Sequence, residues 1–593
     1  MNSSIADRLT LVRKIMHREM VDALYISGTD PHLSEYLCEH WQTRRYFTGF
    51  SGSYGEVVIL PKIAGLWTDT RYFLQAGHEL EGSGIEMHKL RVPEAVSAID
   101  WLLLHLAPGE RLAVDPISLP FATYHHFQEK LRAKQIELVF LPELYNEIWT
   151  DRPSLPKREI FVMPDEIAGK SVSEKIDDVL AVLRSRQTTA TVISALDEVA
   201  WLFNLRGSDI RFAPLFMAYA VVGVNHRAIF VHKQALSSAA RRLLADNAVE
   251  VHDYETIFDF LTDLHHEIFL VEPHSVSTAV WLMIKKGDCV MADKSLVATM
   301  KASKNATEIE GFRHAMLKDG VVMVTFLKWL NDTVGKAPIT EYDVSTKLTE
   351  LRSLQPEFVG ESFESISAYR DHGAMVHMSV DANNAYPLEP DGLLLTDSGG
   401  QYLSGTTDIT RTVALGKVTE RQKRDFTLVL KGMIKLTMAV FPYGTKGIQL
   451  DSLARQSLWE DGLNYGHGTG HGVGHFLSVH EGPVSIRPEC NPNEIVPGMV
   501  FSNEPGVYRE GEYGIRIENL LLCVEKETTP FGRFLGFDTL TLCPIDNRLL
   551  IPEMLLPAER QWLNDYHERV RKTLTPLLDD VVKSYLVEIT QPA

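Results

Sequence analysis

The chain has few cysteines, no long apolar run and no excess of basic residues. Its five cysteines are odd in number and never spaced as CxxC, which excludes a disulfide framework or zinc knuckle and favours a reducing compartment. No run approaches the roughly 18 apolar residues of a membrane span, and the N-terminus reads as an amphipathic helix without a signal-peptide core. A formal net charge of −19 argues against a nucleic-acid surface. We expect a cytoplasmic protein without nucleic-acid or membrane partners.

Two stretches of the N-terminal half resemble each other. Residues 22–145 alternate β-rich runs such as "DALYIS" with helical runs such as "HLSEYLCEHW" (32–41), which predicts an α/β domain. After a proline-rich boundary near residue 155, "TATVIS" at 189–194 starts the same pattern, and "AYAVVGV" and "RAIFVH" correspond to the earlier "EVVILP" and "AGLWTD". The sequence therefore predicts a duplicated domain, over 1–155 and 156–303.

The remaining half changes character. Asn305 followed by Glu308 is a capping-box signature and predicts the start of a helix. From residue 361 the chain becomes rich in β-branched residues and glycine. We assign 304–530 to a third domain and 531–593 to an extension, whose long helical pattern "PAERQWLNDYHERVRKTLTPLLDDVVKSYL" we interpret as one packing or subunit-contact helix.

Four carboxylates in this third domain interrupt runs that otherwise look buried. Asp397 ends "GLLLTD", Asp408 lies in "GTTDITRTV", Glu504 in "VFSNEPG" and Glu518 in "GIRIENLLL". An unpaired buried carboxylate costs several kcal/mol, so such groups are normally paired or bound to a cation. A salt bridge explains any one of them as well as a metal does, but four beside a histidine-rich segment favour metal.

That segment is "YGHGTGHGVGHFLSVHEGP", residues 465–483. His467 and His471 are four apart, as in a helical zincin motif. Gly468 stands where a zincin has Glu, and glycine at every second position makes a helix costly. We predict an extended or looping segment whose glycines allow close backbone approach. A glycine-rich surface loop is the alternative, but it does not explain the apolar spacing that resumes in "HFLSVHEGP".

One histidine with several carboxylates is a hard, oxygen-rich ligand set. It suits Mn²⁺, and less selectively Co²⁺ or Zn²⁺. More carboxylates than one ion needs indicate two ions that share ligands and activate a water for hydrolysis. The residues alone thus predict a dinuclear metallohydrolase.

In this order, "TDSGGQYLSGTTDITRTV", "HGTGHGVGHFLSVHEGP", "NEPGVY" and "GIRIENL" resemble the Xaa-Pro aminopeptidase (aminopeptidase P) family, and most closely its three-domain cytosolic type. "RRYFTGFSGSYGEVVIL" and "FLGFDTLTLCPID" extend the likeness over nearly the whole chain. The resemblance implies two tandem creatinase-like α/β domains, a pita-bread catalytic domain of α+β type and a dimer-forming extension. It also implies cleavage of the bond before a penultimate proline by a water or hydroxide that bridges two divalent ions.

Carried over by position, the metal ligands implied by the resemblance are Asp397, Asp408, His471, Glu504 and Glu518. The spacings agree, with eleven residues between the aspartates and fourteen between the glutamates. In the family pattern Asp408 and Glu518 bridge both ions, Asp397 completes one, and His471 and Glu504 complete the other.

The resemblance also implies roles beyond ligation. His377 and His480 would contact the scissile carbonyl or the proline side, and His467 would assist proton transfer. Glu504 is the family's usual base, and Arg516 would hold a ligating carboxylate. His475 receives no role, because the family usually carries a small residue there. We also expect no site role for five histidines without motif support: His125, His126, His265, His266 and His372.

Two other interpretations remain. A prolidase, which cuts Xaa-Pro dipeptides, has similar ligands, but the duplicated N-terminal domain and "HGTGHGVG" favour the aminopeptidase. A catalytically dead pita-bread protein used as a binding module should lack ligands, and all five are present. Ser502, Asn503 and Met378 depart from the family's frequent residues, which bears on substrate preference rather than on metal binding.

Overall fold

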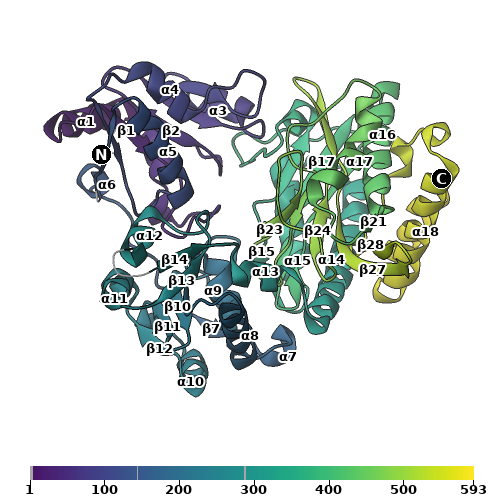
Figure 1. Ribbon diagram of the computed structural model, residues 1–593. Coiled ribbons are helices and arrows are strands. Elements are labelled where there is room, and N and C mark those ends of the chain that lie inside the picture. The colour runs from purple at the N-terminus through teal and green to yellow at the C-terminus, as the bar shows by residue number, and fades with distance from the viewer. Residues whose placement is uncertain (1–3, 143, 286–288) are drawn as a thin grey trace. The chain divides into compact units, whose positions relative to one another are not determined.

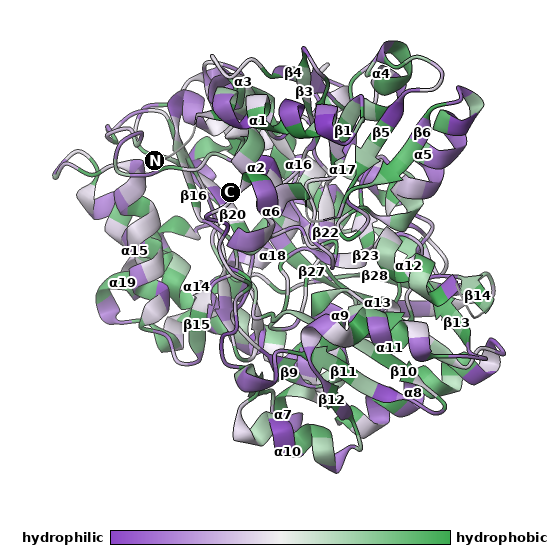
Figure 2. Cartoon of the chain, turned by 90° about the vertical axis from the view of Figure 1, so that its left-hand side faces the viewer, coloured by the Kyte–Doolittle hydropathy of each residue, from purple (hydrophilic) through white to green (hydrophobic). Residues whose placement is uncertain are grey.

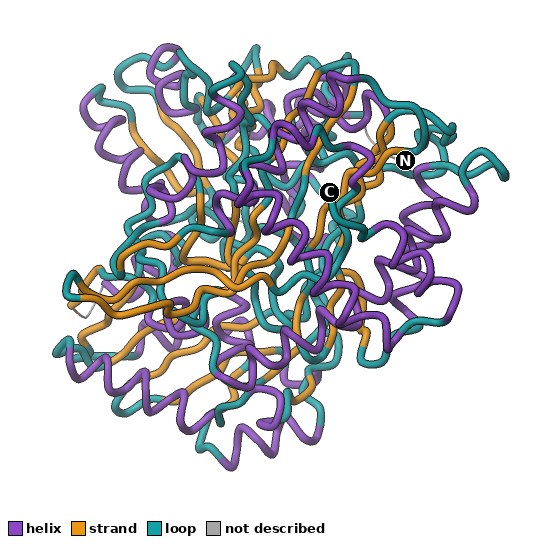
Figure 3. The backbone as a smooth tube through the Cα atoms, turned by 90° about the vertical axis from the view of Figure 1, so that its right-hand side faces the viewer, coloured by secondary structure: helices purple, strands orange, loops and turns teal. Residues whose placement is uncertain are grey.

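The computed structural model describes residues 4–142, 144–285 and 289–593. The chain forms two compact units: the first comprises Met1–Asp165 and Lys170–Val297, and the second Glu166–Gly169 and Ala298–Ala593. Figure 3 shows helices and strands in both units, and in the second unit the seven strands from β22 (Gly470–Gly472) to β28 (Gly532–Thr539) follow one another without an intervening helix. Within the described ranges, no helix combines the length and apolar character that crossing a membrane requires.

The first unit begins with a six-stranded sheet of order β4-β3-β2-β1-β5-β6. Its central strand β1 pairs antiparallel with β2 and parallel with β5. Short apolar runs such as "ALYI" and "AGLWT" are buried along their whole length, as expected of strands covered on both faces. The strands are β1 (Ala23–Ile26), β2 (Glu56–Ile59), β3 (Ala64–Thr68), β4 (Glu86–Lys89), β5 (Arg111–Val114) and β6 (Glu137–Phe140).

A second six-stranded sheet, of order β12-β11-β10-β8-β13-β14, repeats the first strand for strand. Central strand β8 again pairs antiparallel with one neighbour, β10, and parallel with the other, β13. The predicted duplication is therefore confirmed. The strands are β8 (Ala190–Ile193), β10 (Ala218–Gly223), β11 (Arg227–Val231), β12 (Glu250–His252), β13 (Ile268–Val271) and β14 (Cys289–Ala292), and β7 (Phe161–Val162) pairs with β9 (Leu205–Arg206) outside this sheet.

Helices cover both faces of these sheets (Figure 1). In the first sheet, Leu24 faces a core with Val12 of α1, whereas Tyr25 faces a core with Leu102 of α4. The helices of this unit are α1 (Ile5–Arg18), α2 (Thr43–Thr48), α3 (Phe73–Glu79), α4 (Ala98–His105), α5 (Phe121–Ala133), α6 (Leu144–Ile148), α8 (Val172–Ser185), α9 (Leu196–Leu202), α10 (Ser238–Asp246), α11 (Ile257–Asp263) and α12 (Thr278–Lys285). Helix α7 (Asp165–Ala168) and helix α13 (Leu296–Ala302) lie where the chain passes from one unit to the other.

The predicted helix over 32–41 is wrong, because only Glu39–Trp41 forms a short 3₁₀ turn. Asp30 Oδ1 accepts hydrogen bonds from the backbone N–H groups of His32 and Ser34. Leu33 adopts φ of 59°, in the left-handed region. Local side-chain bonds to the backbone therefore replace the helix at this point.

The second unit begins with α14 (Ala306–Thr333), whose Asn305/Glu308 capping box is present as predicted. Its largest sheet has the order β21-β28-β27-β24-β22-β23, and a three-stranded sheet has the order β16-β17-β20. The strands are β15 (Phe358–Glu361), β16 (Ile366–Tyr369), β17 (Leu393–Ser398), β18 (Gly400–Tyr402), β19 (Gly405–Thr406), β20 (Ile409–Ala414), β21 (Val440–Pro442), β22 (Gly470–Gly472), β23 (Glu481–Ile486), β24 (Val500–Asn503), β25 (Gly506–Arg509), β26 (Tyr513–Arg516), β27 (Asn519–Thr529) and β28 (Gly532–Thr539).

Amphipathic helices pack around these sheets, and their ribbons carry both hydrophilic and hydrophobic residues (Figure 2). The main core joins Phe426 and Val429 of one helix to Ile515 of β26 and Leu563 of the C-terminal extension. The segment 465–483 is extended or looping as predicted, with only the short strand β22 before β23 begins. The helices are α15 (Glu341–Ser353), α16 (Glu420–Thr437), α17 (Gly447–Trp459), α18 (Pro557–Leu574) and α19 (Asp580–Ile589).

The single long C-terminal helix predicted for residues 557–586 is wrong in one respect. The pattern forms two helices, α18 and α19, separated by a 3₁₀ turn over Thr575–Leu577. Pro576 lies in that turn and cannot supply the backbone N–H that a continuous helix needs. Asp579 then caps the second helix, since its side chain accepts from the N–H groups of Val581 and Val582.

Candidate metal centre

The four carboxylates and the histidine singled out in the sequence come from separate elements of the second unit. Asp397 lies within β17, Asp408 directly precedes β20, and Glu518 lies between β26 and β27. His471 lies in β22, and Glu504 directly follows β24. Strands β17 and β20 pair in one sheet, whereas β22, β24 and β27 belong to another. Two sheets thus contribute to one site.

Four of the five side chains converge closely. One ligand atom each of Asp408, His471 and Glu518 lies within 4.8 Å of the others. His471 Nε2 lies 3.5 Å from Asp408 Oδ2 and 3.5 Å from Glu504 Oε1. His471 Nδ1 lies 2.9 Å from the carbonyl oxygen of Gly472, to which it can only donate. Nε2 is therefore the nitrogen that faces the carboxylates.

Asp397 is connected to this group through Arg516 and Thr410. Arg516 Nη2 donates to Asp397 Oδ2 at 2.5 Å, and Arg516 Nε donates to Thr410 Oγ1 at 3.1 Å. The same hydroxyl donates to Glu518 Oε2 at 2.8 Å. Among the described residues, the buried Oδ1 of Asp397 has no hydrogen-bond partner. A buried carboxylate oxygen without a donor fits a bound cation, so the residues present suit a metal site.

The charges of the cluster act on one another. Burial raises the pKa of Glu504 to about 7. Burial, together with the charges of Asp408, Asp397 and Glu504, raises the pKa of Glu518 well above its usual range. Burial lowers the pKa of His471, but the hydrogen bond to Asp408 and the charges of Glu504 and Asp408 outweigh it and raise this pKa to about 9. Such a cluster is stabilised by protons or by cations, and its oxygen-rich donors suit divalent ions such as Mn²⁺.

A chain of hydrogen bonds leads from Asp397 to His467. Tyr508 in β25 places its hydroxyl oxygen 2.7 Å from Arg516 Nη1, which donates to it. The hydroxyl is also 2.8 Å from His467 Nε2. Nδ1 of His467 lies 2.7 Å from the carbonyl of Gly468, so Nε2 is the nitrogen that accepts the tyrosine proton when the ring is neutral. His467 is thereby coupled to the carboxylate cluster through two residues.

The other two histidines that the sequence assigned to substrate also lie near the cluster. The ring of His480 stands edge-on to that of His471, with the ring centroids 4.4 Å apart. Arg516 Nη2 donates to the carbonyl of Val376 at 3.5 Å, which places the backbone next to His377 beside the site. All the sequence-predicted site residues therefore belong to one neighbourhood of the second unit.

Sequence reasoning missed three residues that orient this site: Thr410, Tyr508 and Ser502. The Ser502 hydroxyl accepts from the N–H of His471 at 3.0 Å and donates to Glu504 Oε1 at 3.2 Å, so it ties two of the predicted ligands together. The signal for Thr410 and Ser502 was their spacing, because each lies two residues from a predicted ligand on a strand and so on the same side as that ligand. Tyr508 closes the quoted motif "NEPGVY".

Other polar residues near the motifs have structural partners. The ring of His475 packs edge-on against Phe312, with a centroid distance of 5.6 Å. His372 Nδ1 lies 2.9 Å from the buried carboxylate of Glu341. The Asn503 amide donates to the carbonyl of Met433 in α16, so this departure from the family's residues lies against a helix. His125, His126, His265 and His266 are exposed.

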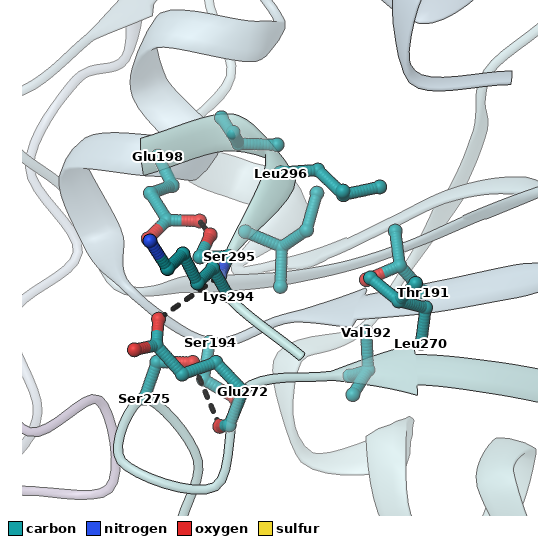
Figure 4. A pocket seen from close by; sticks show the side chains of 12 residues that line it. Thr191, Val192, Ser194, Glu198, Leu270, Glu272, Ser275, Lys294, Ser295 and Leu296 are labelled. Carbon is teal, nitrogen blue, oxygen red and sulfur yellow. Dashed lines mark hydrogen bonds between the residues drawn. The ribbon is translucent and has the colours of Figure 1, made fainter. Parts of the chain in front are cut away.

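A polar pocket in the first unit does not compete as a substrate site. It lies at the ends of β8 and β13, where Ser295 Oγ donates to Glu198 at 2.7 Å and the Ser295 N–H donates to Glu272 at 3.1 Å (Figure 4). Its volume is about 10 Å³. That is the space of about one water molecule, whereas small-molecule sites usually measure about 300–1,000 Å³.

Comparison with known proteins gives matches along the whole chain. Residues 310–525 match metallopeptidase family M24, and residues 533–593 match the C-terminal region of such peptidases. Residues 8–148 and 151–308 each match a creatinase/prolidase N-terminal domain. The fold and the site thus define a metallopeptidase of family M24 that carries two creatinase-like N-terminal domains.

Individual relatives are more specific. The chain is 38% identical to a probable Xaa-Pro aminopeptidase P of Pyricularia oryzae, over 99% of both chains, and 37% identical to one of Paracoccidioides brasiliensis, also over 99% of both. A crystal structure of X-prolyl aminopeptidase from Caenorhabditis elegans, described as a cytosolic enzyme with a di-nuclear active site, superposes with a TM-score of 0.96 at 34% identity and full coverage of both chains. The chain belongs to the Xaa-Pro aminopeptidase P family, and its enzymatic class is that of an Xaa-Pro aminopeptidase.

Proposed function

We propose that Asp397, Asp408, His471, Glu504 and Glu518 bind two divalent metal ions, and that these are Mn²⁺, with Co²⁺ or Zn²⁺ as alternatives. The observation that carries the proposal is the convergence of Asp408, His471 and Glu518 within 4.8 Å, beside a buried Asp397 oxygen that lacks a hydrogen-bond donor among the described residues. Asp408 and Glu518 are the proposed shared ligands. The di-nuclear active site named for the enzyme of Caenorhabditis elegans supports the count of two.

Bound divalent ions supply two kinds of chemistry here, since they polarise the scissile carbonyl and lower the pKa of a nucleophilic water. The chain's own groups perform the proton transfers. Glu504 is the proposed base that takes the proton from the nucleophilic water. His467 is proposed to assist proton transfer, and the Tyr508 hydroxyl lies 2.8 Å from its Nε2. His377 and His480 are proposed to hold the carbonyl and the proline side of the peptide.

The substrate class follows from the bond before proline. That bond is a tertiary amide without an N–H, so a peptidase that hydrogen-bonds the N–H handles it poorly. A site that instead acts on the carbonyl and protonates the nitrogen suits peptides with proline at the second position. We propose such peptides as the substrates.

The test is cleavage of Arg-Pro-Pro, Arg-Ala-Pro and the dipeptide Arg-Pro by metal-stripped protein with and without added Mn²⁺. We expect arginine release from Arg-Pro-Pro only, and only with the metal. Cleavage of the dipeptide alone would identify a prolidase. Failure to cleave any of the three with metal bound would favour a catalytically inactive binding module. His471→Ala, measured for Mn²⁺ content as well as activity, tests the proposed ligand directly.

We further propose four domains, over 1–155, 156–303, 304–530 and 531–593, a cytoplasmic location and a homodimer formed through the extension. The matched ranges support the boundaries. The cytosolic relative and the five free cysteines support the location. Leu577 and Val581 of the extension are 53% and 63% exposed, which supports an apolar contact between copies. Fractionation of the native cell, with the protein detected by antibody, tests the location.

A further inference from the structure

Arg411 in β20 is a buried cation behind the proposed metal ligands. Its side chain is 1% exposed, and within the described ranges no carboxylate lies within ion-pair distance of it. It donates six hydrogen bonds, all to neutral oxygens: the carbonyls of Thr410, Glu518, Cys543 and Pro544, the Asn519 amide and the Tyr566 hydroxyl. A buried guanidinium held in this way costs free energy unless every donor is satisfied, so its partners are fixed closely in place.

These partners fall into two groups. One group belongs to the proposed metal centre, because the carbonyl of Glu518 accepts from Arg411 Nη1 at 2.5 Å and Glu518 is a shared ligand. Thr410, whose carbonyl also accepts from Nη1 at 2.9 Å, uses its hydroxyl to hold the Glu518 carboxylate. Asn519, directly after Glu518, also belongs to this first group. The other group, Cys543, Pro544 and Tyr566, belongs to the C-terminal extension, residues 531–593. Arg411 therefore connects the backbone behind the ligands to the extension.

Tyr566 of α18 completes the connection. Its hydroxyl accepts from Arg411 Nη2 at 3.1 Å and lies 2.9 Å from the carbonyl of Cys543, to which it donates. The N–H of Cys543 lies 3.3 Å from the same oxygen. The ring is buried in the main core and stacks on Trp562, with the ring planes 7° apart. The hydroxyl is thus held rigidly where it meets the guanidinium.

We infer that the C-terminal extension is a functional support of the metal centre, in which Tyr566 acts through Arg411 to hold Glu518 and the start of β20 in their ligating positions. Both are positioning residues, since neither touches the cluster oxygens directly. Groups that orient metal ligands typically change metal affinity about 10–100-fold when removed. This inference rests on the ligand set proposed above. It assigns the extension a role in the site that is separate from any contact between copies.

The test compares Tyr566→Phe with Tyr585→Phe. The control lies on α19 of the same extension and loses a hydroxyl that makes no hydrogen bond among the described residues. Mn²⁺ affinity and stoichiometry are measured by calorimetry on metal-stripped protein, alongside the melting temperature of the metal-free form. We expect Tyr566→Phe to weaken Mn²⁺ binding about 10-fold, and Tyr585→Phe to bind as the wild type does. Arg411→Met should weaken Mn²⁺ binding more than Tyr566→Phe does. If Arg411→Met fails to fold, the comparison of Tyr566→Phe with Tyr585→Phe still tests the inference.

The outcomes separate the two proposals. A lower melting temperature of metal-free Tyr566→Phe with unchanged Mn²⁺ affinity would mean a structural role only and would overturn this inference. Wild-type protein that binds two ions shows that the metal-centre proposal stands whatever the variant does. Wild-type protein that binds no Mn²⁺ would overturn the ligand set, and this inference with it.

Discussion

At the scale of single residues, the hydroxyl of Tyr508 connects His467, which is proposed to assist proton transfer, to the Arg516 that holds the proposed metal ligand Asp397. It lies between His467 Nε2, at 2.8 Å, and Arg516 Nη1, at 2.7 Å, and Arg516 in turn holds Asp397. Burial raises the pKa of Tyr508 to about 12, so the hydroxyl stays protonated at neutral pH and can donate to the histidine. The orientation of His467 therefore depends on this tyrosine.

We expect Tyr508→Phe to lower kcat on Arg-Pro-Pro about 10- to 100-fold, which corresponds to the roughly 1.5–3 kcal/mol of a hydrogen bond to a charged group. The Mn²⁺ content should stay at the wild-type level, because Arg516 still holds Asp397. Steady-state kinetics and elemental analysis measure both. Tyr443→Phe, at a tyrosine that is 47% exposed, is the matched control. A variant that loses its metal would show that Tyr508 holds the ligands rather than the proton donor.

The residue scale also shows what the sequence can and cannot predict. Asp397, Asp408 and Glu518 were predictable because a charged residue in an apolar strand is rare enough to be noticed. Tyr508 was not, because tyrosine is ordinary in strands; spacing placed Thr410 beside Asp408, but its role depends on the partner that folding brings opposite it. Thr410 lies 108 positions from Glu518, the carboxylate that it holds.

At the scale of elements, a buried group of three charges joins the start of β23 to the segment that precedes α14. Glu481 accepts from Lys301 Nζ at 2.8 Å and from Lys304 Nζ, and the three side chains are at most 2% exposed. Burial is the main cause that lowers the pKa of Lys304, and the charge of Glu481 opposes this shift. One carboxylate thus neutralises part of the charge of two ammonium groups.

This imbalance predicts unequal effects of substitution. Glu481→Gln should lower the free energy of unfolding by about 3–5 kcal/mol, since it removes the carboxylate that both buried ammonium groups contact. Lys304→Met should cost clearly less, because Lys301 and Glu481 remain as a neutral pair. Thermal melting of the metal-free proteins measures the order, with Asp332→Asn at an exposed helical pair as control. Equal losses for the two variants would contradict the charge argument.

Helix α18 carries a buried histidine, His567, which should make the stability of the fold depend on pH. Burial, followed by the charges of Arg411 and Arg571, lowers the pKa of His567 to about 4. Its Nε2 accepts from the N–H of Ile545 at 3.1 Å, which requires the neutral ring. The unfolded chain takes up this proton near pH 6.5, but the folded chain does so only near pH 4, so stability is present above pH 6.5 and is lost as the pH falls towards 4.

The expected loss from His567 between pH 7 and pH 5 is about 2 kcal/mol. His567→Gln keeps an acceptor for Ile545 but does not titrate, so its melting temperature should fall less over this interval than that of the wild type. His125→Gln, at an exposed histidine, should follow the wild type. An identical fall for all three proteins would show that His567 is already charged in the folded state.

Element boundaries were the least predictable part of the fold. The capping box at Asn305 and Glu308 was read correctly, because both of its residues are local in sequence. The expected helix over 32–41 failed because, besides the local bonds to Asp30, the buried His32 bonds to the Ser194 carbonyl and the Tyr254 hydroxyl, 162 and 222 positions away. Long-range partners of this kind override local propensity and leave no periodic signal.

At the scale of the whole molecule, the two sheets of the first unit have the same strand order and the same pairing of their central strands. The sequence predicted this as a duplicated domain. The extension has a buried face and an exposed apolar part. Leu563, Tyr566 and Val570 of α18 are buried in the core of the second unit. Leu577 and Val581 lie on the surface, and they carry the proposed contact between copies.

We expect light scattering at micromolar concentration to give twice the 66.8 kDa of one chain. The double variant Leu577→Asp/Val581→Asp should give the mass of a single chain, because two buried charges at a contact between copies disfavour association. Leu104→Asp, at a leucine that is 75% exposed in the first unit, should leave the mass unchanged. A wild-type mass of one chain would contradict the homodimer.

The hydrogen bonds of the buried Arg411 guanidinium affect how the chain folds during its synthesis on the ribosome. Arg411 and Tyr566 lie 155 positions apart, which at about 5–20 residues per second means on the order of 10–30 s of synthesis between them. During that time the Arg411 side chain lacks the acceptors that the extension supplies, so burying its charge would cost free energy. The backbone behind the proposed ligands therefore gains its last hydrogen-bond partner only after the extension has been synthesised.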